Sequence, residues 1–177
     1  PRIAELGEYL ADAWGKIGLK VKQDVRDAVG FRDGMWAVDP NDHVAYKFDS
    51  NGKVVMTLGK KGVKGDNSSH DAFNRPSTMF FTPNGNIFVA DGYENSRVVE
   101  FTKDGKFIKS FSSYGEGNGQ IRSPHAIAVD SHDRLFVGDR SNNRVDIFDK
   151  DGNFIAYWKQ FGRPSGIAID AKDMLYV

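Results

Sequence analysis

The sequence contains no cysteine, no excess of either charge and no long hydrophobic run. Without cysteine, neither a disulfide framework nor a thiolate metal site can form. Lys plus Arg number 24 and Asp plus Glu number 24, so the formal charge is zero, whereas proteins that bind nucleic acid normally carry a basic excess. No apolar run approaches the roughly 20 residues that span a bilayer. We therefore expect neither a nucleic-acid partner nor a membrane partner.

Turn-forming residues and a sufficient hydrophobic fraction are what the sequence does contain. Hydrophobic residues make up 40% of the chain, which is enough for a packed core. The 19 glycines often follow Asp or Asn, as in Asn51-Gly52, Asp104-Gly105 and Asp151-Gly152. Such pairs are the strongest short-range signal for tight hairpins. The composition therefore favours an all-β protein.

A repeated unit runs through the chain. Each copy has a short hydrophobic segment that ends in Asp, a second apolar segment that ends in Phe, and then an Asn-Gly or Asp-Gly pair. The first segments of the three copies are Trp36–Asp39, Phe88–Asp91 and Phe136–Asp139. A further copy begins at Arg163. The period is 48 residues from Pro76 to Pro124 and 40 residues from Pro124 to Pro164.

The clearest copy predicts four strands. Alternation of apolar and polar residues and the positions of turn residues place them at 126–129, 135–137, 145–148 and 154–158. Four antiparallel strands every 40 to 50 residues are typical of a β-propeller blade. A β-sandwich is the alternative for such spacing, but it would not require self-similar units. We predict an all-β propeller of four-stranded blades.

The predicted organisation has an N-terminal segment, 1–24, and a propeller segment, 25–177. The blades are expected at 25–70, 74–121 and 122–162, with a partial blade at 163–177. About three and a half blades are too few to close a ring, because each blade buries its faces against neighbours. The chain begins at Pro1 without Met and stops within an expected strand. We therefore expect either a fragment of a longer protein, the simpler interpretation, or closure by a second copy as a homodimer through the open blade edges.

Residues 1–24 do not follow the repeat. Apolar residues recur every three or four positions, which predicts an amphipathic helix that ends near Gly18, followed by a short strand. The apolar positions are Ile3, Leu6, Leu10, Trp14 and Ile17. The stretch 10–21 resembles a segment of periplasmic peptide-binding proteins of transport systems, which would imply a chimeric chain. The alternative is an ordinary helix packed across the propeller.

The blades resemble NHL repeats, and residues 36–177 resemble the bacterial relatives of peptidyl-α-hydroxyglycine α-amidating lyase. The segments that carry this resemblance are 73–76, 86–93, 95–98, 123–130 and 137–140. The resemblance implies a six-bladed ring whose central channel receives a peptide or small amide. It also implies a zinc ion held by one His from each of three blades, and it allows calcium as a further cation. The compartment stays open, with a periplasmic or secreted location favoured.

The resemblance assigns roles to three residues. His125, in Pro124-His125, matches one zinc ligand. Tyr93, in Asp91-Gly92-Tyr93, matches the catalytic base, and Arg140, in Asp139-Arg140, matches an arginine that stabilises charge. Zinc with an open coordination position would act as a Lewis acid on the substrate hydroxyl.

The match to the zinc site is incomplete. Ser77 follows Pro76 and Ser165 follows Pro164, where the family places His, and the first blade has Val25-Arg26 instead. A single imidazole holds zinc poorly, so we expect the isolated chain to be inactive. The alternative function is a non-catalytic propeller that binds a protein or peptide, and RNA binding ranks third because the net charge is zero.

Two further residue types recur with the repeat. Asp39, Asp91 and Asp139 share one position, and we expect them to accept hydrogen bonds from loop backbone N–H groups. Arg97 and Arg144 also share a position. For these two, we expect ion pairs or hydrogen bonds from blade to blade.

Overall fold

The structure is a computed structural model that describes residues 35–49 and 51–177. The predicted helix and strand of the N-terminal segment, and Val25-Arg26, lie outside the described residues. The described residues fall into two compact units, one with residues 35–37, 46–49 and 51–56 and the other with residues 38–45 and 57–177. Strands β1 (Met35–Asp39), β2 (Val44–Phe48) and β3 (Val54–Leu58) pair in chain order as a three-stranded sheet.

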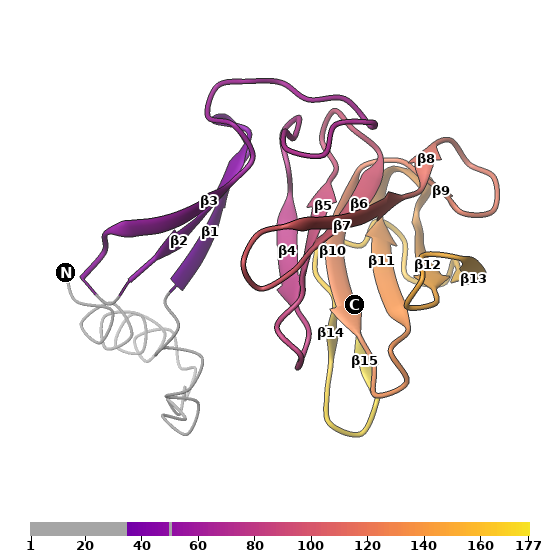
Figure 1. Cartoon of the computed structure of the whole chain (residues 1–177). Helices are drawn as coiled ribbons and strands as arrows, with labels where there is room; N and C mark the ends of the chain where they lie inside the picture. Colours follow the sequence, from indigo (N-terminus) through magenta and orange to yellow (C-terminus); the bar gives the residue numbers. More distant parts are fainter. Residues whose placement is uncertain (1–34, 50) are drawn as a thin grey trace, which may run out of the picture. The chain divides into compact units, whose positions relative to one another are not determined.

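Two four-stranded antiparallel sheets make up most of the second unit (Figure 1). The first contains β4 (Thr78–Phe81), β5 (Ile87–Asp91), β6 (Arg97–Phe101) and β7 (Phe107–Phe111). The second contains β10 (Pro124–Val129), β11 (Leu135–Asp139), β12 (Arg144–Phe148) and β13 (Phe154–Trp158). In both sheets the strands pair in chain order, as in a propeller blade. The all-β class and the four strands predicted after residue 125 are confirmed, while the blade limits stay predictions.

Short elements complete the described chain. Strands β8 (Ser113–Tyr114) and β9 (Gln120–Ile121) pair in parallel, and β14 (Ala168–Ile169) pairs antiparallel with β15 (Leu175–Tyr176). A single 3₁₀ turn, η2 (Arg140–Asn142), follows β11. Within the described residues there is no α-helix, and no helix has the length and apolarity to cross a membrane.

The hairpin turns form as the Asp-Gly pairs predict. Between β12 and β13, the Asp149 carboxylate accepts hydrogen bonds from the backbone N–H groups of Asp151 and Asn153. Gly152 has a φ of +88°, a conformation that is costly for residues with a side chain. The turn therefore sets the register in which β13 returns along β12.

The core of the second unit lies between the two complete sheets. Phe88, Ala90 and Val98 from the first sheet belong to one buried cluster with Ile127 and Leu135 from the second. Each large apolar side chain buried in this way contributes roughly 1.5–3 kcal/mol. The inner strands β5, β6, β11 and β12 are buried throughout, so their sequences do not alternate strictly between apolar and polar residues.

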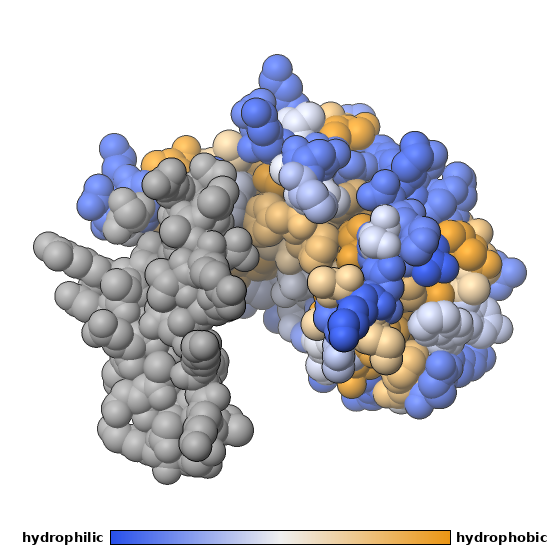
Figure 2. All heavy atoms as spheres, turned by 90° about the horizontal axis from the view of Figure 1, so that it is seen from below, coloured by the Kyte–Doolittle hydropathy of each residue, from blue (hydrophilic) through white to orange (hydrophobic). Residues whose placement is uncertain are grey.

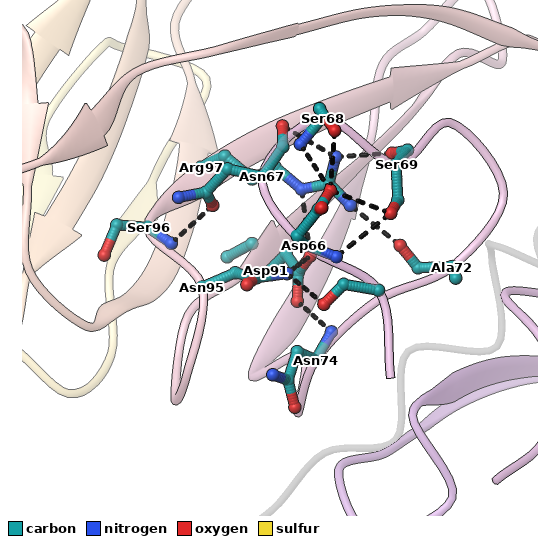
Figure 3. Close-up of polar contacts among 12 residues, drawn as sticks. Asp66, Asn67, Ser68, Ser69, Ala72, Asn74, Asp91, Asn95, Ser96 and Arg97 are labelled. Carbon is teal, nitrogen blue, oxygen red and sulfur yellow. Dashed lines mark hydrogen bonds and ion pairs between the residues drawn. The ribbon is translucent and has the colours of Figure 1, made fainter. Parts of the chain in front are cut away.

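A buried aspartate–arginine pair joins each complete sheet to the loop that precedes it. In the first sheet, Arg97 Nε donates to Asp91 Oδ2 over 2.9 Å, and both side chains are at most 1% exposed (Figure 3). The guanidinium also donates to backbone carbonyls of the preceding loop, those of Asn67, Ser69 and Ala72. The other Asp91 oxygen accepts from the backbone N–H of Asn74 over 2.8 Å.

The second sheet repeats this network. Arg144 Nε lies 3.2 Å from Asp139 Oδ2, and its other nitrogens donate to the carbonyls of Glu116, Gly117 and Gln120. Asp139 accepts from the backbone N–H of Arg122 over 2.7 Å. The predicted role of the aspartates is therefore confirmed. Each arginine forms its ion pair within its own sheet, with the Asp opposite it on the neighbouring strand. The predicted hydrogen bonds from blade to blade are present, because both guanidinium groups donate to carbonyls of the segment assigned to the preceding blade.

Candidate functional site

Tyr93 and His125 meet where the two complete sheets adjoin. Tyr93 lies in the loop after β5, and His125 is the second residue of β10. Tyr93 Oη is 2.9 Å from His125 Nε2, and the two rings meet edge to face at 5.6 Å. Two of the three residues singled out by the resemblance are thus in direct contact, although 32 positions separate them in the sequence.

The hydrogen bonds of His125 fix its tautomer. Its Nδ1 is 2.9 Å from the backbone oxygen of Ser165, which can only accept. Nδ1 therefore carries the proton, and in the neutral imidazole Nε2 is left to accept the phenolic proton of Tyr93. This is an acid–base pair held at hydrogen-bond distance, the geometry that proton transfer requires.

Close backbone approach brings the Tyr93 loop to β10. Gly92 passes so near Pro124 that a Cβ on Gly92 would lie 2.0 Å from the Pro124 oxygen. The Tyr93 N–H donates to the Arg75 oxygen over 3.1 Å, which holds the loop from the other side. A glycine before Tyr93 is thus required by the contact between two neighbouring sheets.

We expect Gly92→Ala to destabilise the chain by roughly 1–3 kcal/mol, because the added methyl must push β10 away from the loop. It should also break the Tyr93–His125 hydrogen bond. Urea unfolding and the imidazole ¹⁵N chemical shifts measure the two effects. Gly166→Ala is the matched control, since nothing lies within 4 Å of a Cβ there. Equal stability of the two variants would contradict the close-approach argument.

Arg75 is a part of this site that sequence reasoning missed. Its guanidinium carbon lies 5.4 Å from the centre of the Tyr93 ring, and Nη1 is 3.4 Å from a Glu94 oxygen. Its backbone N–H donates to Nδ1 of the buried His43 over 3.1 Å. The Asn74-Arg75-Pro76 motif was visible in the sequence, but no periodicity links Arg75 to a tyrosine 18 residues later.

Arg140 occupies a different environment. It begins η2, and its backbone N–H donates to the Ser123 oxygen over 3.4 Å. Its Nε is buried and has no hydrogen-bond partner among the residues with described positions. Across the described part of the chain, no hydrogen bond or ion pair joins Arg140 to Tyr93 or His125. Its assignment to the site stays a prediction.

The described residues do not fit the three-histidine zinc centre that the resemblance implies. From 35 to 49 and from 51 to 177, no group of three or more His, Cys, Asp or Glu side chains could hold a metal ion. At the position equivalent to His125, Ser77 donates through Oγ to the Pro124 oxygen over 2.6 Å. The corresponding serine of the last repeat, Ser165, contributes the backbone oxygen that His125 contacts. Of the histidines expected as ligands, the described chain supplies His125.

Comparison with known proteins agrees with the repeat. The NHL repeat family matches residues 73–101 and 122–148. The chain is 35% identical over 111 residues to the "Probable peptidyl-alpha-hydroxyglycine alpha-amidating lyase pgal-1" of Caenorhabditis elegans, which covers 60% of this chain and 31% of that protein. It is 29% identical over 118 residues to human "NHL repeat-containing protein 3", covering 63% of this chain and 34% of that protein.

A solved structure shares the fold. "Streptogramin B lyase structure" aligns with a TM-score of 0.56 at 13% identity, covering 79% of this chain and 42% of that one. At this identity the likeness concerns the fold alone. The chain spans about a third or less of the length of the curated relatives that it matches. It carries an NHL-repeat, propeller-like domain related to peptidyl-α-hydroxyglycine α-amidating lyases and to NHL repeat-containing proteins.

Proposed function

We propose that this chain is a segment of a six-bladed NHL propeller whose channel binds the α-hydroxyglycine end of a peptide or a small amide. Its blades would be those at 25–70, 74–121 and 122–162, with part of another at 163–177. Tyr93 would face the ligand as the proton acceptor, with His125 as its hydrogen-bond partner and Arg140 as a stabiliser of charge. The observation that carries this proposal is the 2.9 Å contact between Tyr93 Oη and His125 Nε2.

The chemistry of the pair supports a proton-transfer role. His125 is oriented by the Ser165 carbonyl, so its Nε2 lone pair points to the Tyr93 hydroxyl. When the phenol gives its proton to Nε2, the resulting phenolate can take the hydroxyl proton of a bound ligand.

We propose further that the 177-residue chain binds this ligand but does not turn it over. His125 is the one described residue that the resemblance matches to a zinc ligand, and a single imidazole does not make a catalytic zinc site. The second candidate function, a non-catalytic propeller that binds a protein or peptide, is favoured by Ser77 at the position equivalent to His125.

Binding and turnover can be measured separately on the whole chain. A peptide ending in α-hydroxyglycine should shift the NMR signals of Tyr93 and His125, and Tyr93→Phe should weaken binding, because the phenol no longer contacts the ligand hydroxyl. Release of the amide should not exceed that of His125→Ala, and metal analysis should find less than one zinc per chain. Stoichiometric zinc with turnover that His125→Ala abolishes would disprove the inactivity. A ligand that leaves both signals unmoved would disprove the channel site and leave the alternative function.

A further inference from the structure

One row of residues paired across the strands is apolar in the second complete sheet and carries charges in the first. In the second sheet, Phe136 lies opposite Ile147, and Ile147 lies opposite Ala156. These three pack with apolar residues of the following segment, Ile167, Ile169 and Leu175. The equivalent row of the first sheet is Phe88, Glu100 and Lys109. A carboxylate and an ammonium therefore replace the isoleucine and alanine.

A cavity of about 470 Å³ lies beside this charged row. Its walls are both polar and apolar, and the apolar part comes from Phe88 and Ile108 of the first sheet and from Val129 and Leu135 of the second. The turn after β4 and the turn between β12 and β13 form its rim. The cavity lies at the end of β5 opposite to Tyr93. Figure 2 views the chain from this side and shows hydrophobic patches between hydrophilic side chains. The volume is that of an ordinary small-molecule pocket.

Glu100 is buried in a way that the fold does not require. Its side chain is 9% exposed, yet the next repeat fills the same position with Ile147. Burying a carboxylate is costly unless it is paired and hydrogen-bonded. Asn86 Nδ2 donates to Oε1 over 2.8 Å, and Lys109 Nζ is 3.3 Å from Oε2. A carboxylate offers about four acceptor sites, so Glu100 can accept further donors from the cavity.

The charges around the cavity favour a cation. Three carboxylates line it, those of Glu100, Asp133 and Asp151, against the ammonium groups of Lys109 and Lys150, which leaves one negative charge in excess. The Lys109 ammonium is divided among several partners, because it also donates to the Lys150 oxygen over 2.6 Å and lies 3.8 Å from Asp151. It therefore neutralises Glu100 only in part.

We propose that this cavity binds a small organic cation, an alkyl chain ending in a guanidinium or ammonium group. The charged end would bond to Glu100, and the alkyl chain would lie against Phe88, Val129 and Leu135. In the first sheet, the charged row would recognise this cation, whereas the equivalent row of the second sheet makes apolar contacts. The cavity is separate from the Tyr93–His125 pair and does not depend on the lyase-like function.

Butylguanidinium is a suitable probe, with neutral butylurea as its match in shape. In an NMR titration of the whole chain, we expect butylguanidinium to bind at least about tenfold more tightly than butylurea, because a hydrogen bond to a buried charge is stronger than a neutral one. The backbone signals of Ile108 and Lys109 should shift. Equal binding of the two probes, or shifts confined to other residues, would overturn the proposal.

Variants of opposite expected sign test the charged row itself. Glu100→Gln should remove most of the preference for butylguanidinium, whereas Lys109→Gln should strengthen its binding by removing the competing ammonium. Glu116→Gln is the matched control, since this exposed carboxylate pairs with Arg122 outside the cavity. If Glu100→Gln does not fold, Lys109→Gln still decides, because unchanged or weaker binding in that variant contradicts the proposal.

Discussion

Replacing Arg97 with Met is expected to lower the free energy of unfolding by about 3–5 kcal/mol, because it leaves a buried charge without its partner. Arg97 is 1% exposed and is the largest fully buried side chain of the described residues. Its loss would leave the Asp91 carboxylate without its ion-pair partner and remove the donor to three loop carbonyls. Urea unfolding monitored by tryptophan fluorescence and circular dichroism measures the change.

Arg122→Met is the matched control for this prediction. The Arg122 guanidinium pairs with the exposed Glu116 at 2.7 Å, and exposed pairs contribute at most about 1 kcal/mol. If the Arg97 effect arises from the stranded charge, adding Asp91→Asn to Arg97→Met should recover part of the loss. A loss no larger than that of Arg122→Met would show that the buried pair does not hold the loop to the sheet.

The sequence predicted the sheets because its local signals agree with one another. Asp151-Gly152 marked the turn before β13, and the apolar segment at 145–148 coincides with most of β12. The self-similar period indicated that these strands form a unit repeated along the chain. The irregular register of β10 between Pro124 and Ile127 was not predicted, since a bulge depends on pairing partners that the local pattern does not name.

The candidate site was predictable only in part. The family resemblance nominated Tyr93 and His125, and the structure brings them together. Residue pattern alone could not predict this contact, because it results from the close approach of Gly92 to the neighbouring sheet. Glu100 was missed for another reason. A charged residue on a strand usually faces solvent, but β6 is buried along its whole length. A comparison with Ile147 in the next repeat would have been the signal.

The second sheet contains a buried pair of carboxyl groups with one arginine between them. Asp139 and Asp146 are fully buried, and Arg144 Nε lies 3.2 Å from one and 3.0 Å from the other. The Tyr157 ring, 4.7 Å from the guanidinium carbon, covers this cation from β13. In the preceding sheet, Val99 holds the position equivalent to Asp146, so that sheet has a balanced pair. One guanidinium cannot neutralise two carboxylates, and Asp146 Oδ1 has no hydrogen-bond partner among the described residues.

This imbalance should appear as a loss of stability with rising pH. Burial and, after it, the neighbouring Asp139 carboxyl raise the pKa of Asp146 from 3.8 to about 7, while Arg144 opposes both. The folded chain therefore holds a proton that the unfolded chain releases near pH 4, so stability falls between about pH 4 and pH 7 and then levels off. Exposed aspartates such as Asp149 and Asp170 have lowered pKa values, and they act in the opposite sense below pH 4.

Asp146→Asn should remove this pH dependence, because the amide is neutral throughout the range. We expect the variant to be more stable than the parent chain by about 2–4 kcal/mol at pH 8 and nearly equal to it at pH 4, since each pH unit between the two pKa values is worth about 1.4 kcal/mol. Urea unfolding of both chains from pH 4 to pH 8 gives the difference, in which the titration of groups that do not interact with Asp146 cancels. A difference that stays constant over this range would mean that Asp146 is ionised in the folded chain throughout. The Arg144 guanidinium would then stabilise both carboxylates, and the extra acid of the second sheet would carry no proton.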